Sequence, residues 1–243
     1  MTSLRICLAP ILLTVLSLTA AVGCRDSRPP EAQPSARADI PPVPEAAPVK
    51  LTKDTRPIIV AFGDSLTAGY GTEPGQSYPD YLQRLLDEEH YGYRVVNLGI
   101  SGNTTKDGVE RLKDVIALKP ALVIVEFGGN DGLRGLPITS TRENLDNIVH
   151  GLKQSGMKVV LAGITLPPNY GADYIEQFNK NYILIARKYK VPMLPFLLQG
   201  VYGVPGSMQP DQTHATAKGN EQVARNVLAL VSPLLKKPQS KAS

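Results

Sequence analysis

A histidine and an aspartate near the C-terminal end of the chain have the spacing of a general base and its partner. Asp211 and His214 lie three residues apart, in a segment that precedes a predicted helix. In a turn, this carboxylate can accept the Nδ1 proton of the imidazole and stabilise the imidazolium that forms when the ring takes a proton from a hydroxyl. The other two histidines, His90 and His150, lie in predicted helices without such an acid. His214 is therefore the candidate base, and the alternative is a helix-entry histidine with Asp211 as a turn or capping residue.

Three polar segments that contain glycine follow three successive predicted strands. They read GDSL at 63–66, GISGN at 99–103 and GGND at 128–131. Each alone indicates little, because Gly-Asp-Ser can be a turn that leads into a helix and the glycines can serve positive φ angles. The carboxyl ends of parallel strands meet at one edge of a sheet, where ligands bind. We therefore expect all three segments, and with them the Ser65 hydroxyl, to converge at that edge.

Five short apolar runs alternate with five segments whose apolar residues have helical spacing. These elements must position the three glycine-containing segments. Apolar runs predict buried strands, and apolar residues at a helical spacing predict helices. This alternation is typical of a parallel sheet that helices cover on both faces. We predict an α/β fold with three layers, α/β/α, around a central five-stranded parallel sheet. The predicted strands cover residues 57–62, 94–98, 122–127, 158–163 and 191–195, and the predicted helices cover 78–90, 105–118, 139–154, 174–189 and 216–234.

The composition is that of an ordinary globular protein and excludes several function classes. The 243 residues suit one sizeable domain, and the net charge of +4 comes from lysines and arginines that are scattered along the chain. We therefore expect no nucleic-acid partner. The chain has two cysteines, Cys7 and Cys24, and both lie before the predicted domain. This excludes disulfides and thiolate metal sites within the domain.

The first 24 residues have the features of an export signal. Arg5 precedes the apolar run 6–22, which is short for a membrane span and suits a signal peptide. The run ends in Ala-Val-Gly-Cys, which resembles the lipobox of bacterial lipoproteins and implies lipidation of Cys24. The protein would then be anchored in a membrane and face the periplasm. The alternative is ordinary secretion with cleavage near Ala21, which leaves a soluble periplasmic protein.

The remaining chain divides into three parts by composition. Residues 25–56 are rich in proline and predict a disordered tether, which cannot bury enough apolar surface to fold. Residues 57–235 form the predicted domain, and 236–243 form a basic C-terminal tail. We expect this domain to be a monomer.

The combination of motifs resembles the SGNH (GDSL) hydrolase family over nearly all of residues 57–235. The four blocks read FGDSL, GISGNTT, GGND and DQTH, in the order that the family shows. The resemblance implies a flavodoxin-like fold, Ser65 as nucleophile, and His214 as base with Asp211 as its partner. It also implies an oxyanion hole made by Ser65, Gly99 and Asn130. This chemistry needs no metal and no organic cofactor.

The stretches GDSLTAGYG, FGGNDGLRGLP and LPPNYG narrow the resemblance to the bacterial TAP-type branch. That branch comprises thioesterases, lysophospholipases and arylesterases, which implies cleavage of esters or thioesters through an acyl-enzyme. Ser65 does not lie in Gly-x-Ser-x-Gly, so the nucleophile elbow of α/β-hydrolases is excluded. Asp64, adjacent to Ser65 on a tight turn, is interpreted as a local turn-stabilising group. Two alternatives remain: a carbohydrate esterase or acyltransferase that acts on envelope glycans, and a non-catalytic lipoprotein module that binds through the same cleft.

Two loops are candidates for binding the acyl part of a small-molecule or lipid ester. They follow the third and fourth predicted strands and are rich in Leu, Pro and Tyr. The candidate residues are Leu133, Leu136, Pro167 and Tyr170. The alternative is that these residues only pack the rim of the site.

Overall fold

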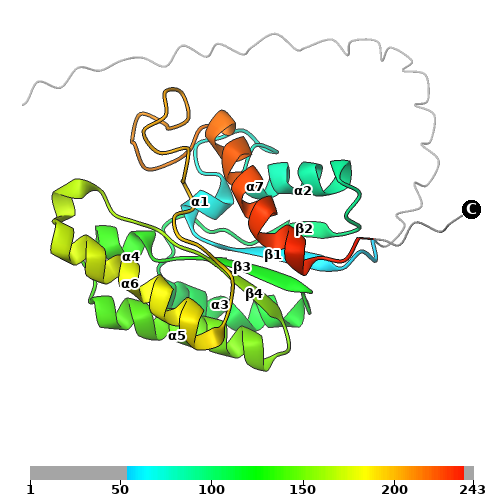
Figure 1. Cartoon of the computed structure of the whole chain (residues 1–243), viewed down its shortest axis with the longest axis horizontal. Helices are drawn as coiled ribbons and strands as arrows, with labels where there is room; N and C mark the ends of the chain where they lie inside the picture. Colours follow the sequence, from blue (N-terminus) through cyan, green and yellow to red (C-terminus); the bar gives the residue numbers. More distant parts are fainter. Residues whose placement is uncertain (1–53, 238–243) are drawn as a thin grey trace, which may run out of the picture. The chain divides into compact units, whose positions relative to one another are not determined.

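The computed structural model describes residues 54–237, which form a parallel five-stranded sheet between two layers of helices (Figure 1). The strand order is β2-β1-β3-β4-β5. The strands are β1 (Ile58–Gly63), β2 (Arg94–Asn97), β3 (Leu122–Glu126), β4 (Lys158–Ala162) and β5 (Met193–Leu194). The three-layer α/β fold that the sequence predicts is thus confirmed.

Helices cover both faces of the sheet. Helices α2 (Tyr78–Glu88) and α7 (Ala217–Val231) pack together on one face, whereas α3 (Thr105–Ala117), α5 (Ile138–Gln154) and α6 (Ala172–Tyr189) cover the other (Figure 1). Two further short helices, α1 (Ser65–Ala68) and α4 (Gly129–Leu133), start directly after β1 and β3. These two helices carry the GDSL and GGND segments, so their orientation depends on the strands that precede them.

Local sequence explains where the longer helices begin and end. Ser77 and Asp80 form a capping box at the start of α2, and Thr104 and Asp107 form one at the start of α3. The last predicted helix was expected to reach residue 234, but α7 ends at Val231 and a 3-10 turn, η2 (Ser232–Leu234), follows. Pro233 accounts for this difference because proline has no amide proton to continue an α-helix.

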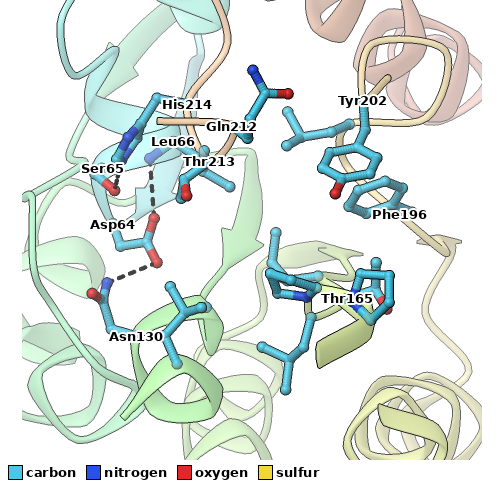
Figure 2. Close-up of a pocket in the computed structure, with 17 residues that line it drawn as sticks. Asp64, Ser65, Leu66, Asn130, Thr165, Phe196, Tyr202, Gln212, Thr213 and His214 are labelled. Atoms are coloured by element: carbon cyan, nitrogen blue, oxygen red, sulfur yellow. Dashed lines mark hydrogen bonds between the residues drawn. The ribbon is translucent and has the colours of Figure 1, made fainter. Parts of the chain in front are cut away.

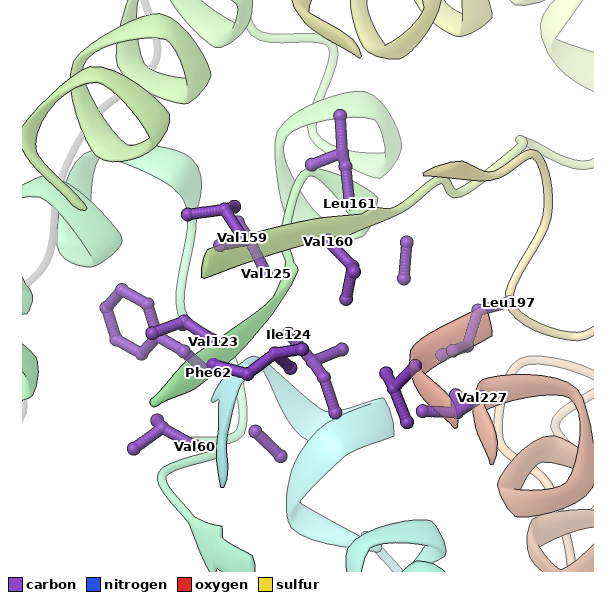
Figure 3. Packing of buried hydrophobic residues seen from close by; sticks show 14 of the residues in the cluster. Val60, Phe62, Val123, Ile124, Val125, Val159, Val160, Leu161, Leu197 and Val227 are labelled. Atoms are coloured by element: carbon purple, nitrogen blue, oxygen red, sulfur yellow. The ribbon is translucent and has the colours of Figure 1, made fainter. Parts of the chain in front are cut away.

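The central strands are apolar on both faces and form the core between the helical layers (Figure 3). Side chains on β3 and β4 alternate between the two faces, and Leu197 and Val227 close the core on the side of α7. Close packing of this kind holds the strand ends rigidly. The labelled core residues are Val60, Phe62, Val123, Ile124, Val125, Val159, Val160, Leu161, Leu197 and Val227.

Several predicted segments lie outside the described residues. They are the signal peptide 1–24 with Cys24, the tether up to residue 53, and the tail beyond residue 237. At the start of the described range, Arg56 donates hydrogen bonds to Asp54 and Asp87. Between residues 54 and 237, no helix combines the length and apolar character that a membrane span requires.

Candidate active site

Ser65 lies at the first position of α1, immediately after the carboxyl end of β1. Asp64 caps this short helix, because its Oδ1 accepts a hydrogen bond of 3.0 Å from the amide of Leu66. Gly69 ends the helix in a left-handed conformation with a φ of 81°. The backbone on both sides of Ser65 is therefore fixed, and its hydroxyl lies at the edge of the sheet that the sequence predicts.

The structure joins Ser65, His214 and Asp211 by a continuous series of hydrogen bonds. His214 Nε2 lies 2.8 Å from Ser65 Oγ (Figure 2), and His214 Nδ1 lies 2.7 Å from Asp211 Oδ2. Burial raises the pKa of Asp211, but hydrogen bonds from His214 and Thr213 outweigh burial and lower that pKa below its ordinary value. Asp211 is therefore a carboxylate at neutral pH. It favours the tautomer of His214 that carries its proton on Nδ1, which leaves Nε2 free to accept the Ser65 proton.

The loop before α7 is held in place by backbone hydrogen bonds and by one aromatic contact. The amide of Gln209 donates to the carbonyl of His214 at 2.8 Å, and Gln209 Nε2 donates to the carbonyl of Tyr70 at 2.7 Å. The Tyr70 ring packs against the His214 ring with 4.6 Å between their centroids. The loop that carries the base is thus tied to the turn that follows the nucleophile.

Asn130 lies on α4 beside Ser65 and is held by two acceptors. Its Nδ2 donates to the carbonyl of Asn103 at 2.9 Å and to Asp64 Oδ2 at 3.2 Å (Figure 2). Asp131, the next residue, is buried and accepts the amide of Thr105 at 2.9 Å, which anchors α4 to the start of α3. The side-chain amide of Asn130 is therefore fixed against Asp64, the residue that precedes the candidate nucleophile.

Gly99 lies in a different environment from the one that the resemblance implies. Its amide donates to Asn97 Oδ1 at 2.9 Å, and a Cβ at this position would overlap the backbone of Ala68. Its amide is thus already occupied, and the glycine serves close packing of the backbone against α1. An asparagine two residues before a glycine is the sequence signal that could have revealed this, because such side chains often bond to the backbone two residues on.

Gly102, the second glycine of the same segment, offers a free amide instead. Its φ is 83° and its carbonyl accepts a hydrogen bond from Arg134, whereas its amide donates to no group within residues 54–237. The neighbouring Asn103 carbonyl is the one that accepts from Asn130. The amides of Gly102 and of its neighbour Ser101 are therefore the two in this loop that remain available to a bound substrate.

An apolar cavity of about 310 Å³ opens beside Ser65 and His214 (Figure 2). Leu133 and Pro167 line it, as the sequence predicts. Leu136 and Tyr170 do not: Leu136 is partly exposed outside it, and the Tyr170 hydroxyl supports the loop by donating to the carbonyl of Leu133 at 2.9 Å. Further side chains on the cavity wall are Ile164, Thr165, Leu166, Phe196, Leu198 and Tyr202.

The far wall of this cavity was missed from the sequence. Phe196 and Tyr202 follow β5 and meet edge to face, with 6.2 Å between their ring centroids, opposite Ser65 and His214 (Figure 2). The signal was available, because the fifth predicted strand ends at the same edge of the sheet as the others and an apolar segment follows it. In the part of the chain that the structure describes, no group of three or more His, Cys, Asp or Glu residues could hold a metal ion.

Comparison with known proteins identifies close relatives of this chain. Residues 61–222 match the GDSL-like lipase/acylhydrolase family. Esterase TesA of Pseudomonas aeruginosa is 43% identical over 178 residues, which cover 73% of this chain and 89% of that protein. An Escherichia coli enzyme named as a thioesterase, protease and lysophospholipase is 35% identical over 178 residues, covering 73% of this chain and 84% of its own length. The crystal structure of TesA matches with a TM-score of 0.71 at 42% identity, covering 73% of this chain and 99% of that chain.

Proposed function

The chain belongs to the GDSL-like lipase/acylhydrolase family and is a serine ester hydrolase, and on this premise we propose that Ser65, His214 and Asp211 form its catalytic triad. The observation that carries this proposal is the hydrogen-bonded chain from Ser65 Oγ through both ring nitrogens of His214 to Asp211. Ser65, at one end of this series of hydrogen bonds, lines an apolar cavity that can hold the acyl part of an ester. A nucleophile, a base and an orienting acid within hydrogen-bond reach are the arrangement that acyl transfer requires.

In the proposed mechanism, His214 Nε2 accepts the Ser65 proton while Ser65 Oγ attacks the carbonyl carbon of the ester. The carbonyl oxygen becomes an oxyanion, which the amides of Ser65 and Gly102 and the Nδ2 of Asn130 stabilise. One such donor contributes on the order of 3 kcal/mol. The collapse of this intermediate expels the leaving group, which takes the proton from His214. Water then attacks the acyl-enzyme by the same steps and releases the acid and free Ser65.

The hydrogen bonds of Asn130 suit this role. Its contact with Asp64 is long, at 3.2 Å, whereas its contact with the Asn103 carbonyl is 2.9 Å. Both bonds keep the amide oriented, and the hydrogen of the longer, weaker bond can be shared with the oxyanion as charge develops there. Catalytic hydrogen bonds are often long before substrate binds and shorten in the transition state.

We further propose that the substrates are esters or thioesters with an apolar acyl group. The cavity wall consists mostly of Leu, Ile, Pro and aromatic side chains, which exclude water from an alkyl chain. Exposed Tyr202 and Leu133 extend this apolar surface to the mouth of the cavity. A glycan acetyl group would leave most of this surface unused, so the cavity favours longer acyl groups over the carbohydrate-esterase alternative.

The test compares hydrolysis of p-nitrophenyl acetate and octanoate by wild-type protein and by Ser65→Ala. We expect a higher kcat/KM for octanoate and the loss of both activities in the variant. A fluorophosphonate probe should label the wild type and the surface control Ser155→Ala, but not Ser65→Ala. A wild-type protein without esterase activity or labelling would favour the binding-module alternative, and a strong preference for acetate would contradict the apolar-acyl proposal.

We also propose that the protein is an exported lipoprotein, anchored through Cys24 by lipid and held on the tether 25–56 as a monomer. One acyl chain binds a membrane only marginally, whereas several chains bind firmly. Cys24→Ser should therefore release the protein from the membrane fraction, and Cys7→Ser, within the predicted signal peptide, is the matched control. If Cys24→Ser and Cys7→Ser fractionate alike, the protein is not anchored at Cys24.

A further inference from the structure

Glu126 is an acidic side chain that is fully buried beneath the candidate active site. It is the last residue of β3, the central strand of the sheet, where it pairs with Gly63 on one side and Ala162 on the other. Its exposed fraction is 0%. An ionised carboxylate in such a place costs several kcal/mol unless it is paired or protonated, so its contacts indicate its charge.

The two oxygens of Glu126 have different surroundings. Oε2 accepts hydrogen bonds from Thr67 Oγ1 at 2.7 Å and from the amide of Asp64 at 3.3 Å. Oε1 is buried and receives no hydrogen bond from any donor in the described range. Gly63 permits this approach, because a Cβ there would overlap Glu126 Oε2. Because Oε1 receives no hydrogen bond within residues 54–237, a proton on Oε1 would allow Glu126 to donate a hydrogen bond itself.

Asp64 is the partner that can accept this proton. Its side chain, 2% exposed, accepts from the amide of Leu66 and from Asn130 Nδ2 (Figure 2). Its own amide donates to Glu126 Oε2, which brings the two carboxyl groups close together. Two buried carboxyl groups in contact cannot both ionise at neutral pH. One of the two therefore keeps a proton, and that proton can form a hydrogen bond between them.

The proton resides on Glu126. Burial raises the pKa of Asp64 to about 6, against the hydrogen bonds from Leu66 and Glu126 and the nearby His214 ring, which lower it. Burial, followed by the charge of Asp64, raises the pKa of Glu126 well above its ordinary value. Asp64 is thus the group of this pair that ionises first, and Glu126 is the group that keeps the proton.

The other titratable groups around the pair do not change this assignment. Tyr78 on α2 and Tyr182 on α6 are fully buried, and burial together with Glu126 raises the pKa of each phenol above its ordinary value. Both phenols are therefore uncharged at neutral pH. Asp131 on α4 is held by Thr105 and Thr141, and the His214 ring faces Asp64 from the loop before α7.

We propose that Glu126 is a positioning residue that acts in its protonated form, donating a hydrogen bond to Asp64 and thereby holding the Asp64 carboxylate against Asn130. This role rests on the function proposed for Asn130 and His214. It has two consequences for the reaction. The Asp64 carboxylate orients the Asn130 amide and lies near the imidazolium that forms on His214. The proton on Glu126 also removes one of two negative charges that would otherwise lie beneath the developing oxyanion.

The test replaces Glu126 by Gln and by Met and records the pH profile of kcat/KM. The carboxamide of Gln keeps the hydrogen-bonding pattern of protonated Glu126 and has no charge. Its oxygen can accept from Thr67, and its N–H can donate to Asp64. Glu126→Gln should therefore keep kcat/KM within about threefold of wild type, with an unchanged acid limb. Glu126→Met removes the donor, so Asp64 should take up a proton at higher pH. The acid limb should move to higher pH, and kcat should fall by on the order of tenfold with little change in KM.

The outcomes separate this proposal from the proposed function. If wild-type protein hydrolyses esters and is labelled by fluorophosphonate, but Glu126→Gln is as impaired as Glu126→Met, then Glu126 acts as a carboxylate and the positioning proposal is wrong. A folded Glu126→Met with the wild-type pH profile also contradicts it. Should Glu126→Met not fold, infrared spectra decide. At pH 8, wild type should show the stretching band of a protonated carboxyl group that Glu126→Gln lacks, and the absence of this band from wild type overturns the proposal.

Discussion

Replacing Glu126 by Gln should stabilise the protein, and the gain should grow with pH. If Glu126 acts in its protonated form as proposed, it keeps its proton in the folded protein, because burial and the charge of Asp64 raise its pKa well above the ordinary value. In the unfolded chain, the same carboxyl group ionises near its ordinary value of 4.5. Above that pH, the folded state binds one proton more than the unfolded state. The free energy of unfolding of the wild type therefore falls as the pH rises, until the pH reaches the pKa of folded Glu126.

The size of this effect follows from the linkage relation. One proton bound only in the folded state changes the free energy of unfolding by about 1.4 kcal/mol per pH unit. Glutamine has no such proton, so the difference in stability between Glu126→Gln and wild type should widen by about 1.4 kcal/mol per pH unit in the window between the pKa of Asp64, about 6, and the raised pKa of folded Glu126. Asp64 shifts in the same direction, but its pKa of about 6 places its contribution below this window.

Urea denaturation curves at several pH values measure the difference directly. The control is Glu176→Gln on the exposed face of α6, which should leave the stability difference from wild type constant across the window. If the difference for Glu126→Gln also stays constant with pH, Glu126 is ionised in the folded protein, and the charge assignment beneath the active site is wrong.

Three further substitutions test the parts of the site separately. Asn130→Ala should lower kcat for p-nitrophenyl octanoate by about 10²–10³-fold in steady-state assays, with little change in KM, and an effect confined to KM would contradict its role at the oxyanion. Asp211→Asn should lower kcat by about 10⁴-fold, because the wrong tautomer of His214 is then favoured. The circular dichroism spectrum should stay unchanged, and a loss of kcat below about tenfold would exclude Asp211 from the triad. Phe196→Ala should raise KM for the octanoate more than for the acetate, and equal effects would place the acyl chain elsewhere.

The order of the elements could be predicted because the buried strands differ sharply from their surroundings. The apolar runs in β1, β3 and β4 are covered on both faces, and no surface segment within residues 54–237 has a similar run. The two short helices α1 and α4 were not predicted, since four or five residues show no helical period. These helices form because each starts from a fixed strand end. Asp64 caps α1, and Gly128, with a φ of 120°, turns the chain into α4.

The candidate triad was accessible from sequence for a similar reason. Asp211 and His214 are neighbours in one turn, so their contact is local and needs no tertiary information. Ser65 required only the rule that parallel strands end at one edge. Gly99 needed one further local signal, because the availability of its amide depends on Asn97, two residues before it. A motif identifies the loop, but the hydrogen bonds within the loop determine which amide faces a substrate.

The role proposed for Glu126 depends on a single strand pairing that the motifs do not contain. In sequence it is the end of an apolar strand and precedes the GGND segment, and nothing local indicates its burial. The parallel register places it directly beside Gly63, the residue before Asp64. Because Gly63 has no side chain, the Glu126 side chain has space to turn beneath Asp64, the residue after Gly63. Once that pairing is known, the sequence predicts that the carboxyl groups of Glu126 and Asp64 lie close together, and electrostatics then favours one proton on the pair.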